Sequence, residues 1–136
     1  MGMSVNLKQL LIAKNDWFAE QIMEGVRGSE YGFITPAQSR LLAHMGGKPI
    51  NMAELSRKLG ISRQAVHKTV AELARRGILQ LQEDPERGNS KLVVYTDKGM
   101  EVNSVGVAII ESIETQISKK IGVKPLEQLK ELLSKI

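Results

Sequence analysis

Apolar residues recur at helical spacing near the start of the chain and predict a long amphipathic helix from Ser4 to about Arg27. One helical face carries Leu7, Leu11, Phe18, Ile22 and Val26. The next helix is expected to start at Thr35-Pro-Ala-Gln38. Threonine suits the N-cap there, proline the first helical position, and glutamine the third position of a capping box. Gly46-Gly47 predicts where that helix stops.

Two short helices joined by a tight turn are predicted between Asn51 and Gly77. Asn51 suits the N-cap of the first, with Glu54 as its expected capping-box partner, and Gly60 ends it in the left-handed conformation. Ser62 suits the N-cap of the second helix, which Gly77 closes in the same way. The second helix has one apolar face and one polar, basic face. This is the pattern of a helix-turn-helix, whose second helix can enter the DNA major groove.

Two short runs follow, Ile78–Gln82 and Leu92–Tyr95, and they predict strands around the polar loop 83–91. Gly88-Asn89 is expected to supply the positive-φ residues of the hairpin tip. The residues 48–50 predict a short extended piece before the helix-turn-helix. A helix-turn-helix followed directly by a hairpin predicts a winged helix, with the two-stranded hairpin as its wing.

Two amphipathic helices are expected at the end of the chain. The first begins at Thr96, and its apolar stripe consists of Val102, Val105, Ile109, Ile113 and Ile117. The last carries a narrow seam that consists of Leu126, Leu129, Leu133 and Ile136. The winged helix can cover only part of these end helices, so we expect them to join two copies into a homodimer. End helices that fold back on their own domain are the alternative.

The predicted fold is therefore mainly α. We expect a single domain over residues 1–136, with a winged helix-turn-helix lobe at 33–96 and dimerisation helices at 4–30 and 97–136. A length of 136 residues fits one domain.

The distribution of charge along the chain predicts a nucleic-acid partner. Between Asn51 and Gly77 the positive excess equals the formal net charge of the whole chain, +4. A local positive excess favours binding to phosphates. The chain has no cysteine, which excludes disulfides and thiolate metal sites. It shows neither an apolar run that could span a bilayer nor a secretory leader, so we expect no membrane partner and a cytoplasmic location.

The order and spacing of several motifs resemble the MarR family of transcriptional regulators. These motifs are Ile34-Thr-Pro-Ala-Gln-Ser-Arg-Leu-Leu42, Leu55-Ser-Arg-Lys-Leu-Gly-Ile-Ser62, Gly77-Ile-Leu79, Asp84-Pro85 and Leu92-Val-Val-Tyr-Thr-Asp-Lys-Gly99. The resemblance implies a helical dimer with one winged helix per subunit. Its members typically repress genes by occupying palindromic operators in double-stranded DNA, and many release DNA when a small, often aromatic, effector binds.

The first turns of the second helix of the helix-turn-helix hold the candidate reading residues. Arg63 suits guanine O6 and N7, and Gln64 suits adenine N6 and N7. Ser62 can bind a phosphate at the helix N-terminus, or act only as an N-cap. His67 and Lys68 follow one turn later, Lys68 as a candidate phosphate anchor. Alternatively, these side chains form an ordinary solvated face.

The wing supplies three further candidates. By the resemblance, Asp84 orients a wing arginine, and Arg87 at the tip contacts DNA. An A·T-rich minor groove would attract such an arginine most strongly. Lys91 on the return strand is the other basic residue here, whereas Glu86 and Asn89 stand where the family usually has basic residues.

Catalytic, metal and cofactor sites are not expected. The two histidines, His44 and His67, fall in different predicted helices and belong to no metal-binding spacing. Neither a nucleophile motif nor a phosphate loop occurs, so we expect no enzyme activity. The competing function is a winged-helix protein–protein interaction module that does not bind DNA.

Four aromatic residues are expected near the junction of the first helix with the DNA-binding lobe and mark a candidate ligand pocket: Trp17, Phe18, Tyr31 and Phe33. The alternative is that they pack into the core or a dimer interface.

Overall fold

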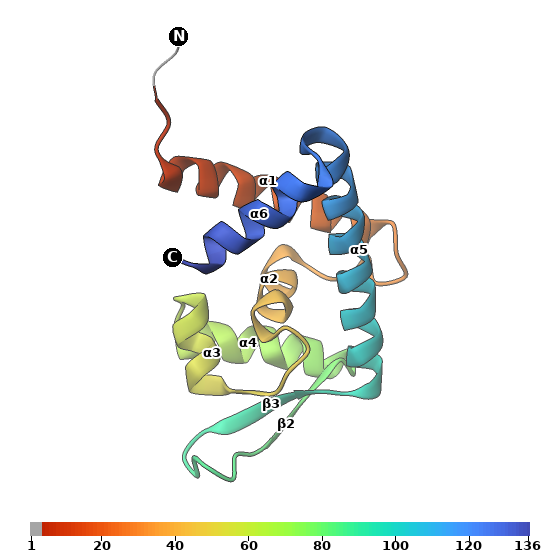
Figure 1. Cartoon of the computed structure of the whole chain (residues 1–136). Helices are drawn as coiled ribbons and strands as arrows, with labels where there is room; N and C mark the ends of the chain where they lie inside the picture. Colours follow the sequence, from red (N-terminus) through yellow and green to blue (C-terminus); the bar gives the residue numbers. More distant parts are fainter. Residues whose placement is uncertain (1–3) are drawn as a thin grey trace.

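The computed structural model describes residues 4–136, as six helices and three short strands. Residues 1–3, which begin the predicted single domain, lie outside the described part. In chain order the elements are α1 (Leu7–Arg27), α2 (Pro36–Met45), β1 (Ile50–Asn51), α3 (Met52–Leu59), α4 (Arg63–Arg75), β2 (Leu79–Glu83), β3 (Lys91–Tyr95), α5 (Asp97–Ile121) and α6 (Val123–Ser134). The prediction of a mainly helical winged helix-turn-helix is confirmed (Figure 1).

Side-chain caps define where the first two helices begin. Helix α1 starts at Leu7 and not at Ser4, because Asn6 is its N-cap and accepts a hydrogen bond from the Gln9 backbone N at 2.8 Å. Thr35 and Gln38 form the predicted capping box of α2, with bonds of 3.2 and 3.1 Å. These local hydrogen bonds satisfy backbone donors that the first turn of a helix leaves free.

Asn51 caps α3 by accepting a hydrogen bond from the Ala53 backbone N at 2.9 Å. The capping box expected with Glu54 is wrong, because Asn51 is also the last residue of β1 and its side chain bonds to the wing. Helix α3 ends as predicted at Gly60, whose φ is +67°. Gly77 likewise closes α4 at a φ of +77°.

The sheet has three antiparallel strands in the order β1-β3-β2. Strands β2 and β3 form the predicted hairpin, in a register that runs from Leu79 opposite Tyr95 to Glu83 opposite Lys91. The extended piece before α3 becomes β1 and pairs with the other edge of β3. The sheet of the wing is therefore joined through β1 to the N-terminus of α3.

The hairpin tip differs from the predicted turn. Neither Gly88 nor Asn89 has a positive φ. The connection at 84–90 turns instead through bonds to Asp84: the Glu86 backbone N donates to Asp84 Oδ1 at 2.9 Å, and the Arg87 backbone N donates to Asp84 O at 3.2 Å. A loop of this length reverses direction without the left-handed residues that a two-residue hairpin turn requires.

The core lies within the winged helix. Its largest fully buried side chains come from α2, α3, α4, the residues after α4 and the sheet: Leu41, Leu55, Val66, Val70, Leu73, Ile78, Leu79 and Val93. One face of α4 is thereby packed against the rest of the lobe, and its other face is left to solvent.

Helix α5 runs from the wing to the opposite end of the molecule, where α1 and α6 lie (Figure 1). All but two of the large exposed hydrophobic side chains in the described part fall within residues 5–12 and 100–136. The exceptions are Ile61 and Leu81. Within residues 4–136, every helix is too short or too polar to cross a membrane.

Candidate nucleic-acid interface

Helix α4 presents one continuous polar face. Its buried side is formed by Val66, Thr69, Val70 and Leu73. The five residues predicted to read DNA are all exposed on and before its first two turns: Ser62, Arg63, Gln64, His67 and Lys68. Ser62 is the N-cap, and its Oγ accepts a hydrogen bond from the Ala65 backbone N at 3.1 Å.

The turn between α3 and α4 is held by two side chains that the sequence reasoning missed. Ser56 Oγ donates to the Ile61 carbonyl oxygen at 2.7 Å. From α2, Arg40 Nη2 donates to the Leu59 carbonyl oxygen at 3.0 Å. One bond satisfies the carbonyl of the last residue of α3 and the other a carbonyl in the turn, and together they hold the direction in which α4 leaves the turn. The Arg40 contact joins residues far apart in sequence, and no local pattern signals it.

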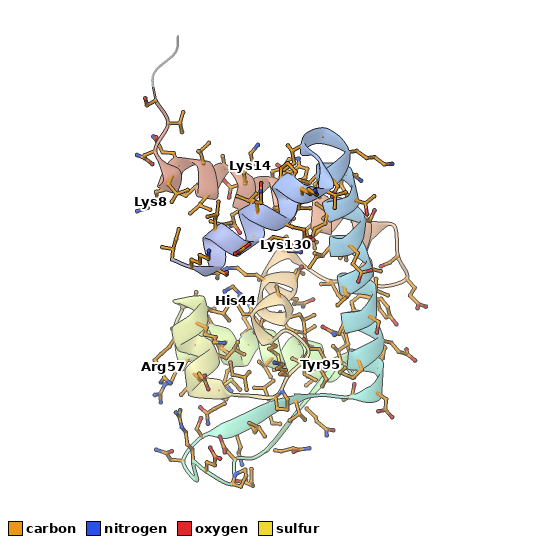
Figure 2. The ribbon with its side chains drawn as sticks, in the orientation of Figure 1. Lys8, Lys14, His44, Arg57, Tyr95 and Lys130 are labelled. Atoms are coloured by element: carbon orange, nitrogen blue, oxygen red, sulfur yellow. The ribbon has the colours of Figure 1, made fainter. Side chains whose placement is uncertain are left out.

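Other basic residues of the lobe are either exposed to solvent or packed on another side chain. Arg57 and Lys58 are exposed on the last turn of α3, and Figure 2 shows Arg57 pointing away from the core. Arg76, at the far end of α4, instead lies over the ring of Phe33, 4.1 Å from its centroid. This cation–π contact directs Arg76 toward the protein. Arg57 and Lys58 therefore add exposed positive charge beside the turn that leads into α4.

In the wing, Arg87 and Lys91 are both exposed. Lys91 forms an ion pair with Glu83, its cross-strand partner on β2. Arg87 Nη1 lies 3.4 Å from Asn51 Oδ1, at the outer limit of a hydrogen bond. The wing thus brings two cations beside α3, one of them already paired with a carboxylate.

Asp84 begins the loop at the tip of the wing, directly after β2, and is buried. Its Oδ2 accepts a hydrogen bond from Asn51 Nδ2 at 2.7 Å, and its Oδ1 accepts one from the Glu86 backbone N. These bonds, the Asn51 one above all, hold the pKa of the Asp84 carboxyl below its ordinary value. Among the described residues, Asp84 makes no direct ion pair with Arg87, and Asn51 bonds to both. The sequence marked Asn51 only as a helix cap.

A cavity of about 220 Å³ lies between the lobe and the end helices. Its lining comes from α1, α2, β3, α5 and the loop after α1, and includes Val26, Tyr31, Leu42, Tyr95, Val105 and Gly106. Tyr95, labelled in Figure 2, was not predicted to be here. Its hydroxyl donates to the Leu42 carbonyl oxygen at 3.2 Å. No Lys, Arg, Asp, Glu or His side chain lines this cavity.

Of the four aromatic residues predicted for a ligand pocket, only Tyr31 lines this cavity. Trp17 and Phe18 pack edge to face on α1, with ring centroids 5.1 Å apart. Phe33 lies under Arg76 and against the edge of Tyr31. The four side chains thus form two edge-to-face pairs, and only one member of one pair reaches the cavity. Within residues 4–136, no three His, Asp or Glu side chains gather as metal ligands.

Comparison with known proteins agrees with this architecture. Residues 34–88 match the model of the MarR family. Uncharacterized proteins of Mycobacterium bovis and Mycobacterium tuberculosis are 29% identical over 68 residues, which are 50% of this chain and 48% of each relative. The chain thus aligns with about half the length of these curated relatives.

Solved structures match almost the whole chain. The apo form of wild-type MarR from E. coli superposes with a TM-score of 0.78 at 19% identity, covering 98% of both chains. The transcriptional regulator Tm0710 from Thermotoga maritima has a TM-score of 0.62 at 25% identity, covering 96% of this chain and 92% of that one. A probable transcriptional regulator from Pseudomonas aeruginosa has a TM-score of 0.70 at 24% identity, covering 96% of both. The segment that matches the MarR family model contains the helix-turn-helix and β2 of the wing, and the whole chain has the winged-helix fold of MarR from E. coli.

Proposed function

We propose that the protein is a sequence-specific regulator that binds a palindromic operator in double-stranded DNA as a homodimer and represses transcription in the cytoplasm. The observation that carries this proposal is the exposed face of α4 from Ser62 to Lys68, held at a fixed angle by the bonded turn before it. A rigid helix with Arg, Gln and Lys on its first turns has the shape and the donors to read a major groove.

The residues of this face divide into two roles. Arg63 and Gln64, in the first turn of α4, reach base edges and provide sequence specificity. Ser62 and Lys68 contact phosphates, as do Arg57 and Lys58 from α3, and these contacts supply affinity that does not depend on sequence. His67 lies between the two groups and contacts either a base or the flanking backbone.

The end helices support a homodimer. Exposed apolar side chains are concentrated at the start of α1 and along α5 and α6, for example Leu11 (44%), Ile110 (38%) and Leu133 (39%). A twofold interface buries the same surface on both copies. The two α4 helices would then meet half-sites about one DNA turn, roughly 10–10.5 bp, apart. One similar structure is described as the Multiple Antibiotic Resistance Repressor, which favours repression over activation.

The cavity is the candidate site for a small effector. It contacts both the DNA-binding lobe and α5, so a ligand that fits only one relative placement of these parts would shift the protein toward that placement. Its lining holds no charged side chain, and burying an unpaired charge is costly. We therefore propose an uncharged, predominantly apolar effector, with the hydroxyls of Tyr31 and Tyr95 as nearby polar groups.

Binding to pooled random DNA duplexes, measured by fluorescence anisotropy at low and moderate salt, tests the DNA-binding function. We expect micromolar affinity that falls steeply with salt. The variant Lys68→Ala should weaken this binding, whereas Lys119→Ala, which removes an exposed charge at the far end of α5, should not. Absence of binding at low salt would favour the protein–protein interaction module. Selection of sites from random DNA then tests the palindrome and its half-site spacing.

A further inference from the structure

The side chain of Asn51 joins the helix-turn-helix to the wing. It is 5% exposed and hydrogen-bonds to four different residues. Its Nδ2 donates to Asp84 Oδ2 at 2.7 Å. Its Oδ1 accepts from the Ala53 backbone N at 2.9 Å, from Ser90 Oγ at 3.1 Å and, more weakly, from Arg87 Nη1 at 3.4 Å. One amide thus contacts the first turn of α3 and both ends of the loop at 84–90.

The chemistry of these partners requires a side chain that both donates and accepts. An ionised Asp84 carboxylate can only accept hydrogen bonds, and the Arg87 guanidinium can only donate them. A carboxamide placed between them satisfies both at once. Asn51 therefore does more than cap α3, because an N-cap needs only the acceptor oxygen.

We propose that Asn51 is a positioning residue for DNA binding, which holds Arg87 at the DNA that flanks the α4 contact by tying the wing loop to the start of α3. The Ser56–Ile61 bond in turn ties α3 to the turn that leads into α4. Arg87 and the exposed face of α4 are consequently held at a fixed distance from each other in the free protein. A loop ordered in advance loses less conformational entropy on binding.

This inference rests on the proposed DNA-binding function, and a charge-swap series tests it. Asn51→Asp keeps a good N-cap but places a second carboxylate against Asp84, where two like charges repel. Adding Asp84→Asn restores one donor and one acceptor with their positions exchanged. Asn15→Asp on the exposed surface of α1 makes the same change away from the wing and is the matched control. Thermal melts confirm that each variant is folded.

DNA binding is measured at pH 8 over a range of salt. We expect Asn51→Asp to lower the salt slope by about one unit, the loss of roughly one phosphate contact, and to match Arg87→Ala. The swapped pair should recover the wild-type slope, and Asn51→Asp combined with Arg87→Ala should bind no worse than Arg87→Ala alone. A wild-type slope for Asn51→Asp, or losses that add in the combined variant, would overturn the inference.

Hydrogen exchange of the free protein separates this inference from the proposed function. The backbone amides of Glu86 and Arg87 should exchange faster in Asn51→Asp and return to wild-type protection in the swapped pair. Unchanged protection would refute the positioning role even if the wild-type protein binds DNA. If the amides respond as expected but the wild-type protein binds no duplex, the tie between α3 and the wing is established and the DNA-binding function fails.

Discussion

The backbone of Gly99 lies directly against the carbonyl oxygen of Ile78: a β-carbon on residue 99 would stand 2.1 Å from that oxygen. The contact occurs where α5 begins, beside the residue that links α4 to β2. Thr96 strengthens the same junction, since its backbone N and its Oγ1 both donate to the Ile78 carbonyl at 3.1 Å. The start of α5 is thereby attached to the winged-helix lobe.

Gly99→Ala should destabilise the protein, because the new methyl group would meet backbone atoms that cannot move aside without breaking the Thr96 bonds. Overpacking of this kind costs about 1–3 kcal/mol or more in free energy of unfolding. Urea denaturation monitored by circular dichroism measures it. Gly88→Ala is the control, since a β-carbon there meets no atom within 4 Å. Equal stability of the two variants would contradict the close approach.

Alanine substitutions at Gly106 in α5 and Gly25 in α1 should change the free energy of unfolding in opposite directions. At Gly106 a β-carbon has open space, so Gly106→Ala should raise the free energy of unfolding by about 0.5–1 kcal/mol through helix propensity. At Gly25 the β-carbon would lie 2.9 Å from the Ile109 side chain, so Gly25→Ala should lower the free energy of unfolding. Thermal denaturation of both variants checks the contrast. Stabilisation by both would show that α1 and α5 are not packed as closely as described.

If α4 reads bases, substitutions on it should change the affinity for the operator and the affinity for random DNA to different extents. Gln64→Ala should weaken binding to the selected operator by about 1–3 kcal/mol and change binding to random duplex little. Lys68→Ala should weaken both equally and lower the salt slope by about one unit. Titrations of both duplexes at several salt concentrations separate the two outcomes. Uniform losses for both variants on every sequence would remove the base-reading role of Gln64.

The hydrogen bonds to Asp84 predict an acid-sensitive wing. Because the folded-state pKa of Asp84 is below its ordinary value of 3.8, the ionised carboxylate stabilises the native state above that value. This contribution is lost as the pH falls through the folded-state pKa. Wild-type protein should therefore lose more stability than Asp84→Asn when the pH drops from 7 to about 3, as denaturant titration would measure. Asp16→Asn, on the exposed surface of α1, is the matched control; a parallel pH profile of wild type and Asp84→Asn would contradict the assignment.

Dimerisation through the end helices predicts that Leu133→Glu yields a folded monomer. Leu133 is 39% exposed in the single chain, so a charge there costs the subunit little but would be buried unpaired in the interface. Sedimentation velocity should show a dimer for wild-type protein and a monomer for the variant. Leu81→Glu, on the wing, should leave the dimer intact. A monomeric wild-type protein at micromolar concentration would contradict the homodimer.

The sequence by itself determined the helices and the class of fold, because their signals are local. Thr35 with Gln38, Ser62 before α4, and Gly60 and Gly77 after their helices each act within a few residues, through capping bonds or a left-handed backbone. The polar face of α4 also followed from sequence, since helical periodicity separates it from the buried side.

Tertiary structure alone decided how the wing is held and where the cavity lies. Asn51 and Asp84 are 33 residues apart, and Tyr95 and Leu42 are 53 apart, so no periodicity or cap relates them. Their contacts arise because β1 joins the far edge of β3 and the last residue of β3 reaches α2, placing these side chains within hydrogen-bonding distance. Whether a polar side chain is solvated, caps a helix or joins two elements depends on the partners that folding brings to it.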